Sequence, residues 1–277
     1  MSTYAKGRGR FYAKYGTKYN QPAWKRLQAC QKPFWKQIGK VGESESANKS
    51  GLAEITLEDS LKVWCVQLLE NAIEREATQI TLQLYRSGMD GFDMVDNGKG
   101  IKKEDWEDLC KCQSYRERNN TYKTRSIGYK GEGLETLCFY TELEILTKEK
   151  EAEFGHSLKF DKNDRSLVTM DPVEDLEEGT IIKVRNVYYE NEEYKNKYLE
   201  TISKQFDDMI EAFTSYGCIL NSIVVTVMND RIPALRTVGA STFAENTLAM
   251  IHKTRGAIEC DELIEVIVNN LPAGYKM

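Results

Sequence analysis

The stretch "SLKVWCVQLLENAIEREATQITLQL", residues 60–84, decides the fold. Its first part places apolar residues at helical spacing, and its last part alternates apolar with polar residues. At about 100° per residue, one side of the helix collects the apolar residues Leu61, Cys65, Leu68, Leu69 and Ala72. The stretch therefore predicts an amphipathic helix over 60–75, followed by a strand over 78–86.

Polar side chains gather on the opposite side of this helix, within about a quarter turn. They are Gln67, Glu70, Asn71 and Glu74. Such a stripe is usually a solvated helix face. The other interpretation is the polar wall of a ligand site, and the segments that follow along the chain favour it.

The composition is that of an ordinary soluble globular protein, with 41% apolar and 29% charged residues in a chain of 277. This length allows one large domain or two smaller ones. We expect no membrane span, because no apolar run approaches the roughly 18 residues that a span needs. We also expect no secretory signal, since residues 1–20 are basic and aromatic without an apolar block.

The cysteines indicate reduced thiols in a cytosolic, nuclear or matrix compartment, because seven of them occur at irregular spacing. A zinc site is not expected. Cys110 and Cys112 have no second cysteine pair, and His156 and His252 are the only histidines in the sequence.

The net charge of −5 hides an asymmetry between residues 1–50, which carry +9, and the remainder, which carries −14. The basic segment also holds eight aromatic residues. Cations interleaved with aromatic rings suit phosphate contact and base stacking, so this arm is a candidate for binding DNA or RNA. A disordered solubilising tail and an organelle targeting sequence are the competing interpretations. Many lysines and tyrosines weaken the second of these.

The rest of the chain alternates predicted strands and helices. Strands are expected at 92–95, 141–148, 156–160, 165–170, 179–187 and 222–228, and helices at 103–112, 131–140 and 191–215. A short turn joins the first two strands, so we expect them to be antiparallel. This order predicts an α+β fold, a sandwich of a mixed β-sheet with helices on one face. The strand at 222–228 is expected to open a second unit.

The segment "DNGKGI", Asp96 to Ile101, ends the second predicted strand. Asp-Asn-Gly by itself is usually a turn. Here Gly98 and Gly100 would also let a ligand approach the backbone. The carboxylate of Asp96 is suited to accept a hydrogen bond from an exocyclic amine such as that of adenine.

The segment "SIGYKGEGL", residues 126–134, carries Gly128, Gly131 and Gly133 before a helix that starts near Glu132. Backbone N–H groups at a helix N-terminus cradle phosphate. Alone, such a loop is more often a flexible turn. In "EEGTIIKV", residues 177–184, the hydroxyl of Thr180 is a candidate to bridge through water to a base.

Taken in this order, the segments resemble the GHKL (Bergerat) ATPase fold and, within it, the MutL family. "QLLENAIEREATQITLQL" resembles the family pattern E-L-V-E-N-S-x-D-A-x-A-T-x-I. "GMDGFDMVDNGKGIKKEDWEDL" and "GYKGEGLETLC" resemble its D-N-G-x-G-I and G-F-R-G-E-A-L segments. The likeness covers about residues 52–250 and is strongest to the eukaryotic post-meiotic-segregation branch.

The resemblance implies a domain organisation with ATP and Mg²⁺ as ligands. Residues 1–51 form the basic arm and linker, 52–200 the ATP-binding domain, and 201–277 a truncated α/β domain of the transducer type. Asn71 matches the ligand of Mg²⁺, which suits an amide oxygen, and Asp96 matches the aspartate that recognises adenine. The remaining ATP-binding residues by this match are Gly98, Gly100, Gly128, Gly131, Glu132, Gly133, Leu134 and Thr180.

Three departures from the family all fall on hydrolysis or closure. Gln67 stands where the family has its general base, a glutamate, and an amide does not accept a proton at neutral pH. Glu70 and Glu74 on the same stripe are weak candidates to replace it. The family's H-P-x-K lysine for the γ-phosphate has no counterpart before Met277, and "SYRERNN" replaces a T-S-K stretch before the lid.

These observations predict an ATP–Mg²⁺-binding, MutL-like protein of DNA mismatch repair or recombination. Nucleotide would gate its conformation, with weak or absent hydrolysis, so whether it is an enzyme stays open. DNA and a second MutL-type subunit are the expected partners, and the nucleus, or else the mitochondrion, is the expected location. The alternative is a pseudo-ATPase scaffold whose basic arm binds RNA or a ribonucleoprotein.

Overall fold

The computed structural model describes residues 60–111, 132–239, 245–247 and 249–250. The predictions for the arm 1–51, for Gly128 and Gly131, and for most of the chain after residue 239 lie outside the described residues.

The described elements match the predicted ones closely in place and type. The helices are α3 (Ser60–Glu74), α5 (Glu132–Tyr140) and α6 (Glu192–Ile219), with the 3-10 helices η1 (Arg86–Gly88) and η2 (Lys103–Asp108). The strands are β1 (Gln79–Tyr85), β2 (Gly91–Asp96), β3 (Glu142–Lys148), β4 (Gly155–Phe160), β5 (Leu167–Val173), β6 (Gly179–Arg185), β7 (Val224–Asn229) and β8 (Ile232–Arg236). The predicted helix at 103–112 is shorter and of the 3-10 type.

The strands form one eight-stranded sheet in the order β5-β4-β3-β6-β2-β1-β7-β8. β1 and β2 are antiparallel, as predicted from the short turn between them. β1 and β7 are parallel, while the other neighbouring pairs are antiparallel, so the sheet is mixed.

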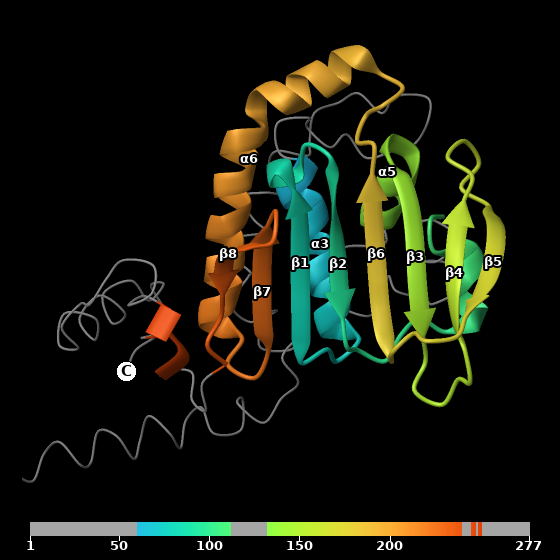
Figure 1. Ribbon diagram of the computed structural model, residues 1–277, viewed down its shortest axis with the longest axis horizontal. Coiled ribbons are helices and arrows are strands. Elements are labelled where there is room, and N and C mark those ends of the chain that lie inside the picture. The colour runs from blue at the N-terminus through green and yellow to red at the C-terminus, as the bar shows by residue number, and fades with distance from the viewer. Residues whose placement is uncertain (1–59, 112–131, 240–244, 248, 251–277) are drawn as a thin grey trace, which may run out of the picture.

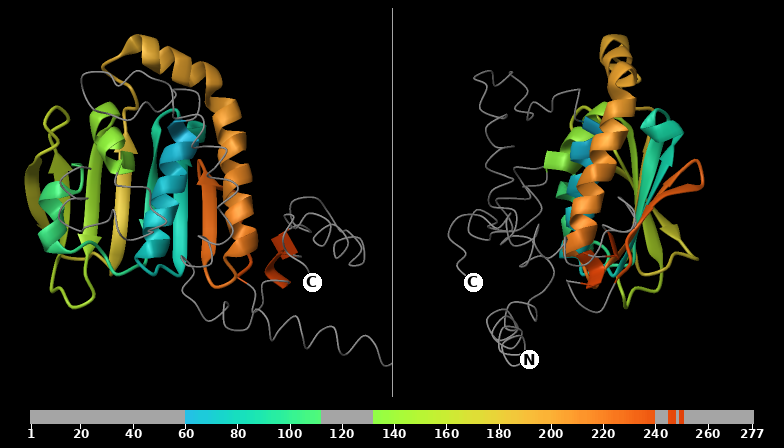
Figure 2. Two further views of the ribbon diagram at one scale, coloured as in Figure 1. Left: turned by 180° about the vertical axis from the view of Figure 1, so that it is seen from behind. Right: turned by 90° about the vertical axis from the view of Figure 1, so that its left-hand side faces the viewer.

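The described helices α3, α5 and α6 all lie on one face of this sheet (Figures 1 and 2). Side chains that alternate along a strand explain the arrangement, because every second residue of β1 points at the helices. Ile80, Leu82 and Leu84 are almost completely buried there. The predicted α+β sandwich is therefore confirmed.

α3 is held between the other two helices. Its Trp64 indole N–H donates to Thr136 Oγ1 of α5 at 3.1 Å. Its Leu61 backbone N–H donates to Gln205 Oε1 of α6 at 2.9 Å. Both bonds are buried, and they satisfy polar groups that would otherwise be costly to remove from water.

α6 runs without interruption through the expected domain boundary between residues 200 and 201. β7, which we expected to open a second unit, hydrogen-bonds to β1 and extends the first sheet. The described residues thus continue one sheet past this point, and the division into two domains stays a prediction. In the described part of the chain, none of the helices combines the length and hydropathy that a bilayer crossing demands.

Candidate functional site

Asp96 ends β2 on the face that the helices cover. Its Cα partner in β1 is the buried Ile80, and its partner in β6 is Thr180. Asp96 Oδ1 accepts a hydrogen bond from the Gly98 N–H at 2.8 Å. Next to it, Asn97 fixes the turn, because its Oδ1 accepts from the N–H groups of Thr78 and Gln79. The turn predicted for this segment is present, and it presents a carboxylate at the end of the sheet.

Burial raises the pKa of Asp96 from its ordinary value to about 6. Hydrogen bonding from the Gly98 backbone, the charge of Arg75 and the Thr180 backbone each lower this pKa, but together they do not offset the burial. A carboxylate that is buried without a full set of partners is typical of functional sites more than of structural ion pairs.

Gly98 and Gly100 allow close packing of the protein's own backbone, while the expected approach of a ligand to them stays a prediction. A Cβ on Gly98 would lie 2.8 Å from the carbonyl oxygen of Arg75. Gly100 has a φ of +68°, and a Cβ there would lie 2.3 Å from the carbonyl oxygen of Lys148. Both glycines therefore pack the loop after β2 tightly against α3 and β3.

Thr180 is buried, with 4% of its surface exposed, and lies between two residues on neighbouring strands. Its Cα partners are Asp96 in β2 and Thr147 in β3, so the three side chains share the covered face. The Thr147 hydroxyl accepts from the Ile101 N–H at 2.8 Å and donates to the Gly179 carbonyl at 3.3 Å. The hydroxyl groups of Thr180 and Thr147 therefore lie beside Asp96 on the covered face of the sheet.

Gln67 and Asn71 on α3, and Arg75 directly after its end, follow one another at intervals of four; the Arg75 N–H donates to the Asn71 carbonyl at 3.1 Å, so the three share one side. Gln67 lies against α5, because a Cβ on Gly133 would be 2.4 Å from its Oε1. Arg75 lies against the loop after β2, beside Gly98. The half-buried Asn71 stands between these two contacts on the same side of the helix, and its pairing with Asp96 in one site stays a prediction.

Gln67 carries an oxygen with no hydrogen-bond partner in the described part of the chain, although that oxygen is buried. Such an acceptor is costly unless something supplies a donor or a positive charge. It lies beside Gly133 in the first turn of α5.

Glu70 departs from the expected stripe. Its side chain is completely buried and accepts a hydrogen bond from the hydroxyl of Tyr216 in α6. The carboxylate is thus turned toward α6, which counts against Glu70 as a replacement base. Glu74 is half-buried at the end of α3. The sequence pattern placed Glu70 with Gln67 because it could not reveal a second helix packing on that side.

α5 begins at Glu132, as predicted, with Gly133 and Leu134 both buried in its first turn. Leu134 has 8% of its surface exposed and belongs to the hydrophobic core. Gly133 lies against the side chain of Gln67, which would have to move to accommodate a Cβ there. Gly128 and Gly131 lie outside the described residues.

The donor set near Asn71 fits Mg²⁺ in the way this ion usually binds. Mg²⁺ commonly takes one or two protein oxygens and completes its shell with phosphate oxygens and water. Asn71 and Gln67, whose Oε1 has no hydrogen-bond partner in the described part of the chain, are residues one helical turn apart. No group of three or more Cys, His, Asp or Glu side chains suited to a metal occurs in the described residues.

Sequence reasoning missed Arg75 and Thr147. Arg75 continues the Gln67–Asn71 series by four residues, so the helical spacing contains the signal for it. Nothing in the sequence marks Thr147, which enters the site only because β3 lies next to β6. A separate cavity of about 500 Å³ lies at β5 and η2, lined by Glu107, Lys111 and residues 166–170, and includes none of the predicted site residues.

Comparison with known proteins identifies a family model over this region. Residues 60–191 match the model described as histidine kinase-, DNA gyrase B-, and HSP90-like ATPase. The mouse mismatch repair endonuclease PMS2 is 27% identical over 213 residues, which cover 74% of this chain and 24% of that protein. The DNA mismatch repair protein MutL of Streptococcus equi subsp. equi is 26% identical over 182 residues, which cover 63% of this chain and 26% of that protein.

Solved structures agree on the fold. The N-terminal domain of a DNA repair protein superposes with a TM-score of 0.60 at 20% identity, covering 71% of this chain and 57% of the other. The Aquifex aeolicus MutL ATPase domain complexed with ADP gives 0.52 at 16% identity, with 70% and 68% covered. The chain spans about a quarter of the length of the curated relatives it matches.

Proposed function

Because this chain carries the ATPase region of the MutL family of GHKL proteins, we propose that it binds ATP with Mg²⁺ and changes conformation with nucleotide occupancy. The proposed role is in DNA mismatch repair or recombination. The observation that supports it most is a series of contacts. Asp96 accepts from the Gly98 N–H, Gly98 lies against Arg75, and the Arg75 N–H donates to the Asn71 carbonyl one helical turn back. ATP with Mg²⁺ suits the pair of Asp96 and Asn71, because adenine lies at one end of the molecule and the magnesium-bound phosphates lie at the other.

In this proposal Asp96 recognises adenine. Its ionised carboxylate accepts a hydrogen bond from the exocyclic amine, and the hydroxyl of Thr180, on the neighbouring strand, bridges to the base through water. Because the pKa of Asp96 is about 6, the carboxylate is mostly ionised at neutral pH and is ready to accept. Burial strengthens a charged hydrogen bond compared with one in water.

Asn71 would hold Mg²⁺, which when bound neutralises charge on the phosphate oxygens. The first turn of α5, from Glu132, offers backbone N–H groups and the positive end of a helix dipole to the phosphates. Gly128 and Gly131, which lie outside the described residues, complete the proposed phosphate loop.

Gln67 accounts for the proposed weak or absent hydrolysis. Its amide is suited to orient a water molecule, but it does not take a proton from that water at neutral pH. Loss of a general base typically lowers the rate by about 10²–10⁴-fold. Glu70 is engaged with Tyr216, so it does not replace the base in this proposal.

The proposal includes DNA and a second MutL-type subunit as partners, with the nucleus as the place of action and the mitochondrion as the alternative. The relatives' names refer to mismatch repair, and the basic arm supplies the charge for DNA or RNA. Deleting residues 1–50 is expected to remove a steep salt dependence of nucleic-acid affinity. Equal affinity with and without the arm would reject that role.

A nucleotide titration combined with a steady-state ATPase assay tests the proposal. We expect ATP to bind at micromolar to millimolar levels with little turnover. Gln67→Glu restores the carboxylate in place, and we expect it to raise turnover by about 10²-fold or more. Gln67→Ala is the matched control, because it removes the amide without adding a base. No binding of ATP would contradict the proposal and favour the scaffold alternative.

A further inference from the structure

Glu70 and Tyr216 form a buried contact to which the proposed function assigns no role. The Tyr216 hydroxyl of α6 donates to Glu70 Oε1, and the two side chains are 5% and 0% exposed. A carboxylate in this position is tolerated only when hydrogen bonds compensate for the lost water. The bond therefore constrains where both helices lie.

The direction of this bond matters because Glu70 precedes Asn71 directly. Successive side chains leave a helix about 100° apart, so Glu70 points to α6 while Asn71 points to the side shared with Gln67 and Arg75. Fixing Glu70 fixes the rotation of α3 about its axis. That rotation sets the direction of the Asn71 amide.

A second bond holds the other end of α3. The Leu61 N–H donates to Gln205 Oε1, and Gln205 is 1% exposed and is itself held by Thr201 at 2.9 Å. This bond lies about 15 Å from Asn71 along the helix, at 1.5 Å per residue. α6 thus holds α3 through both of these bonds, and the Glu70 bond is the one of the two that adjoins the proposed magnesium ligand.

The residue after Tyr216 is held in turn by the chain beyond the sheet. The Asn246 amide donates to the carbonyl oxygen of Gly217, and the Thr247 hydroxyl donates to that of Cys218 at 3.1 Å. Gly217 is tightly enclosed, since a Cβ there would lie 2.7 Å from Thr237. Tyr216 is therefore fixed from both sides, which suits a residue that positions another.

We propose that Glu70 and Tyr216 are positioning residues for Asn71, which together orient its amide toward magnesium-bound nucleotide. This inference rests on the proposed function and adds to it that α6 controls the metal contact. Partners that orient a metal ligand typically change metal affinity by about 10–100-fold when removed.

The test measures how strongly Mg²⁺ improves ATP binding, as the ratio of Kd in EDTA to Kd in excess Mg²⁺. We expect Tyr216→Phe to lower this ratio about tenfold while Kd in EDTA stays within about twofold. Glu70→Ala should act like Tyr216→Phe. Glu70→Gln keeps an acceptor oxygen for the hydroxyl and should retain a ratio close to that of the unchanged protein.

Gln205→Ala is the matched control, because it removes the distant grip of α6 on α3. It should lower the melting temperature as Tyr216→Phe does and leave the ratio unchanged. An unchanged ratio in Tyr216→Phe, beside a clear magnesium effect in the unchanged protein, would overturn this inference alone. A ratio lowered equally by Gln205→Ala would also overturn it, since any loosening of α3 would then suffice. Failure of the unchanged protein to bind ATP would reject the proposed function and this inference with it.

Discussion

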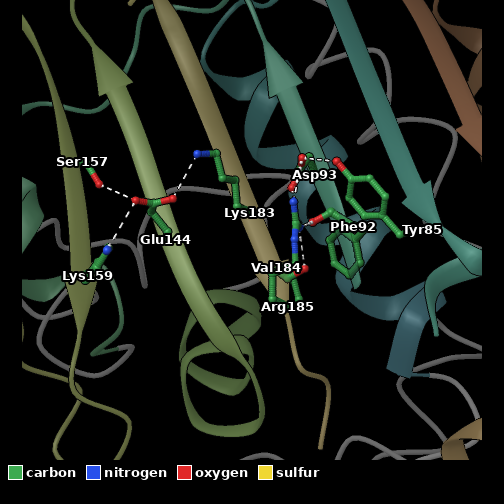
Figure 3. Close-up of polar contacts among 9 residues, drawn as sticks. All are labelled: Tyr85, Phe92, Asp93, Glu144, Ser157, Lys159, Lys183, Val184 and Arg185. Carbon is green, nitrogen blue, oxygen red and sulfur yellow. Dashed lines mark hydrogen bonds and ion pairs between the residues drawn. The ribbon is translucent and has the colours of Figure 1, made fainter. Parts of the chain in front are cut away.

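Asp93 and Asp96 lie three residues apart on β2 and face opposite sides of the sheet. Asp93, on the face without described helices, receives both Nη atoms of Arg185 at 2.6 and 3.1 Å and the hydroxyl of Tyr85 at 2.6 Å (Figure 3). Asp96, on the face that the helices cover, interacts with the backbone of Gly98 and Thr180 and with the charge of Arg75, and burial outweighs all three. The carboxylates of two aspartates on one strand thus differ greatly in the hydrogen bonds and ion pairs that they make within the protein.

The contrast extends beyond the two residues. On the open face, Glu144 accepts from Ser157 and Lys183 and lies 3.8 Å from Lys159 (Figure 3). Burial raises the Glu144 pKa, but these bonds and charges outweigh it and leave the pKa below its ordinary value. Carboxylates on this face are matched to partners within the fold, whereas burial outweighs the partners of Asp96 and raises its pKa. The predictions below test that distinction.

Asp96→Asn should produce the largest effect. It removes the charge and keeps an oxygen for the Gly98 N–H, so ATP affinity should fall about 10–100-fold, the range for losing a hydrogen bond to a charged group. Stability at pH 7 should rise, because a poorly solvated charge is gone. A titration and a thermal melt measure both. A loss of stability without a loss of ATP affinity would show that Asp96, like Asp93, stabilises the fold rather than binding nucleotide.

Asp93→Asn should show the reverse pattern. It weakens the paired bonds to Arg185 and Tyr85, which join β2 to β6 and β1. We expect about 1–2 kcal/mol of destabilisation, moderated by the partial exposure of Arg185, with ATP affinity within about twofold. Denaturant unfolding measures the first quantity. A change in affinity as large as that of Asp96→Asn would show that the two faces are not separate in function.

Lowering the pH should change the contributions of Asp96 and Glu144 to folding stability in opposite directions. The folded-state pKa of Asp96, about 6, lies above its unfolded value, so ionisation of Asp96 destabilises the fold above about pH 6. That penalty disappears as the pH falls from about 6 toward 4. Glu144 has a lowered folded-state pKa, so its contribution is present above its ordinary pKa and is lost as the pH falls through the folded value.

ATP affinity should therefore weaken by about tenfold between pH 7 and pH 5, because adenine recognition requires the ionised carboxylate of Asp96. The same titration on Asp96→Asn should be nearly flat over this range. A slope that persists in the variant would assign the pH dependence to another group.

Lys183→Ala should give the smallest effect. Lys183 donates to Glu144 at 3.0 Å, but both side chains are about one-third exposed. Pairs of this kind contribute about 0.2–1 kcal/mol and weaken in high salt. Urea unfolding at two salt concentrations measures it. A larger loss would mean that the open face is one cooperative network.

The secondary structure and the mixed sheet with helices on one face were predictable because their signals are local. Helical spacing in α3 and the turn "DNGKGI" after β2 fix two elements and the place of Asp96 without knowledge of the rest. Residues that belong to the site through strands or helices distant in the sequence were not predictable. Thr147 lies beside Thr180 because β3 pairs with β6. Glu70 points away from the site because it accepts a hydrogen bond from Tyr216, which lies 146 positions later in the sequence.

The course of β7 escaped prediction for the same reason. "SIVVTVM" indicated a buried strand correctly, but nothing within it specifies β1 as its neighbour. Gly98, Gly100 and Gly133 were recognised as special positions. The structure adds which atoms approach each of them, and those atoms come from elements elsewhere in the chain.

The parallel pairing of β1 with β7 also affects how the chain is made. Gln79 pairs with Val224, about 145 positions later, so one edge of a central strand stays open until that segment leaves the ribosome. At about 5–20 residues per second, the delay is roughly 7 to 30 s. During that time an unpaired apolar edge is exposed to other nascent chains. Holdase chaperones, which cover such edges, would thus be expected to improve the yield of this protein.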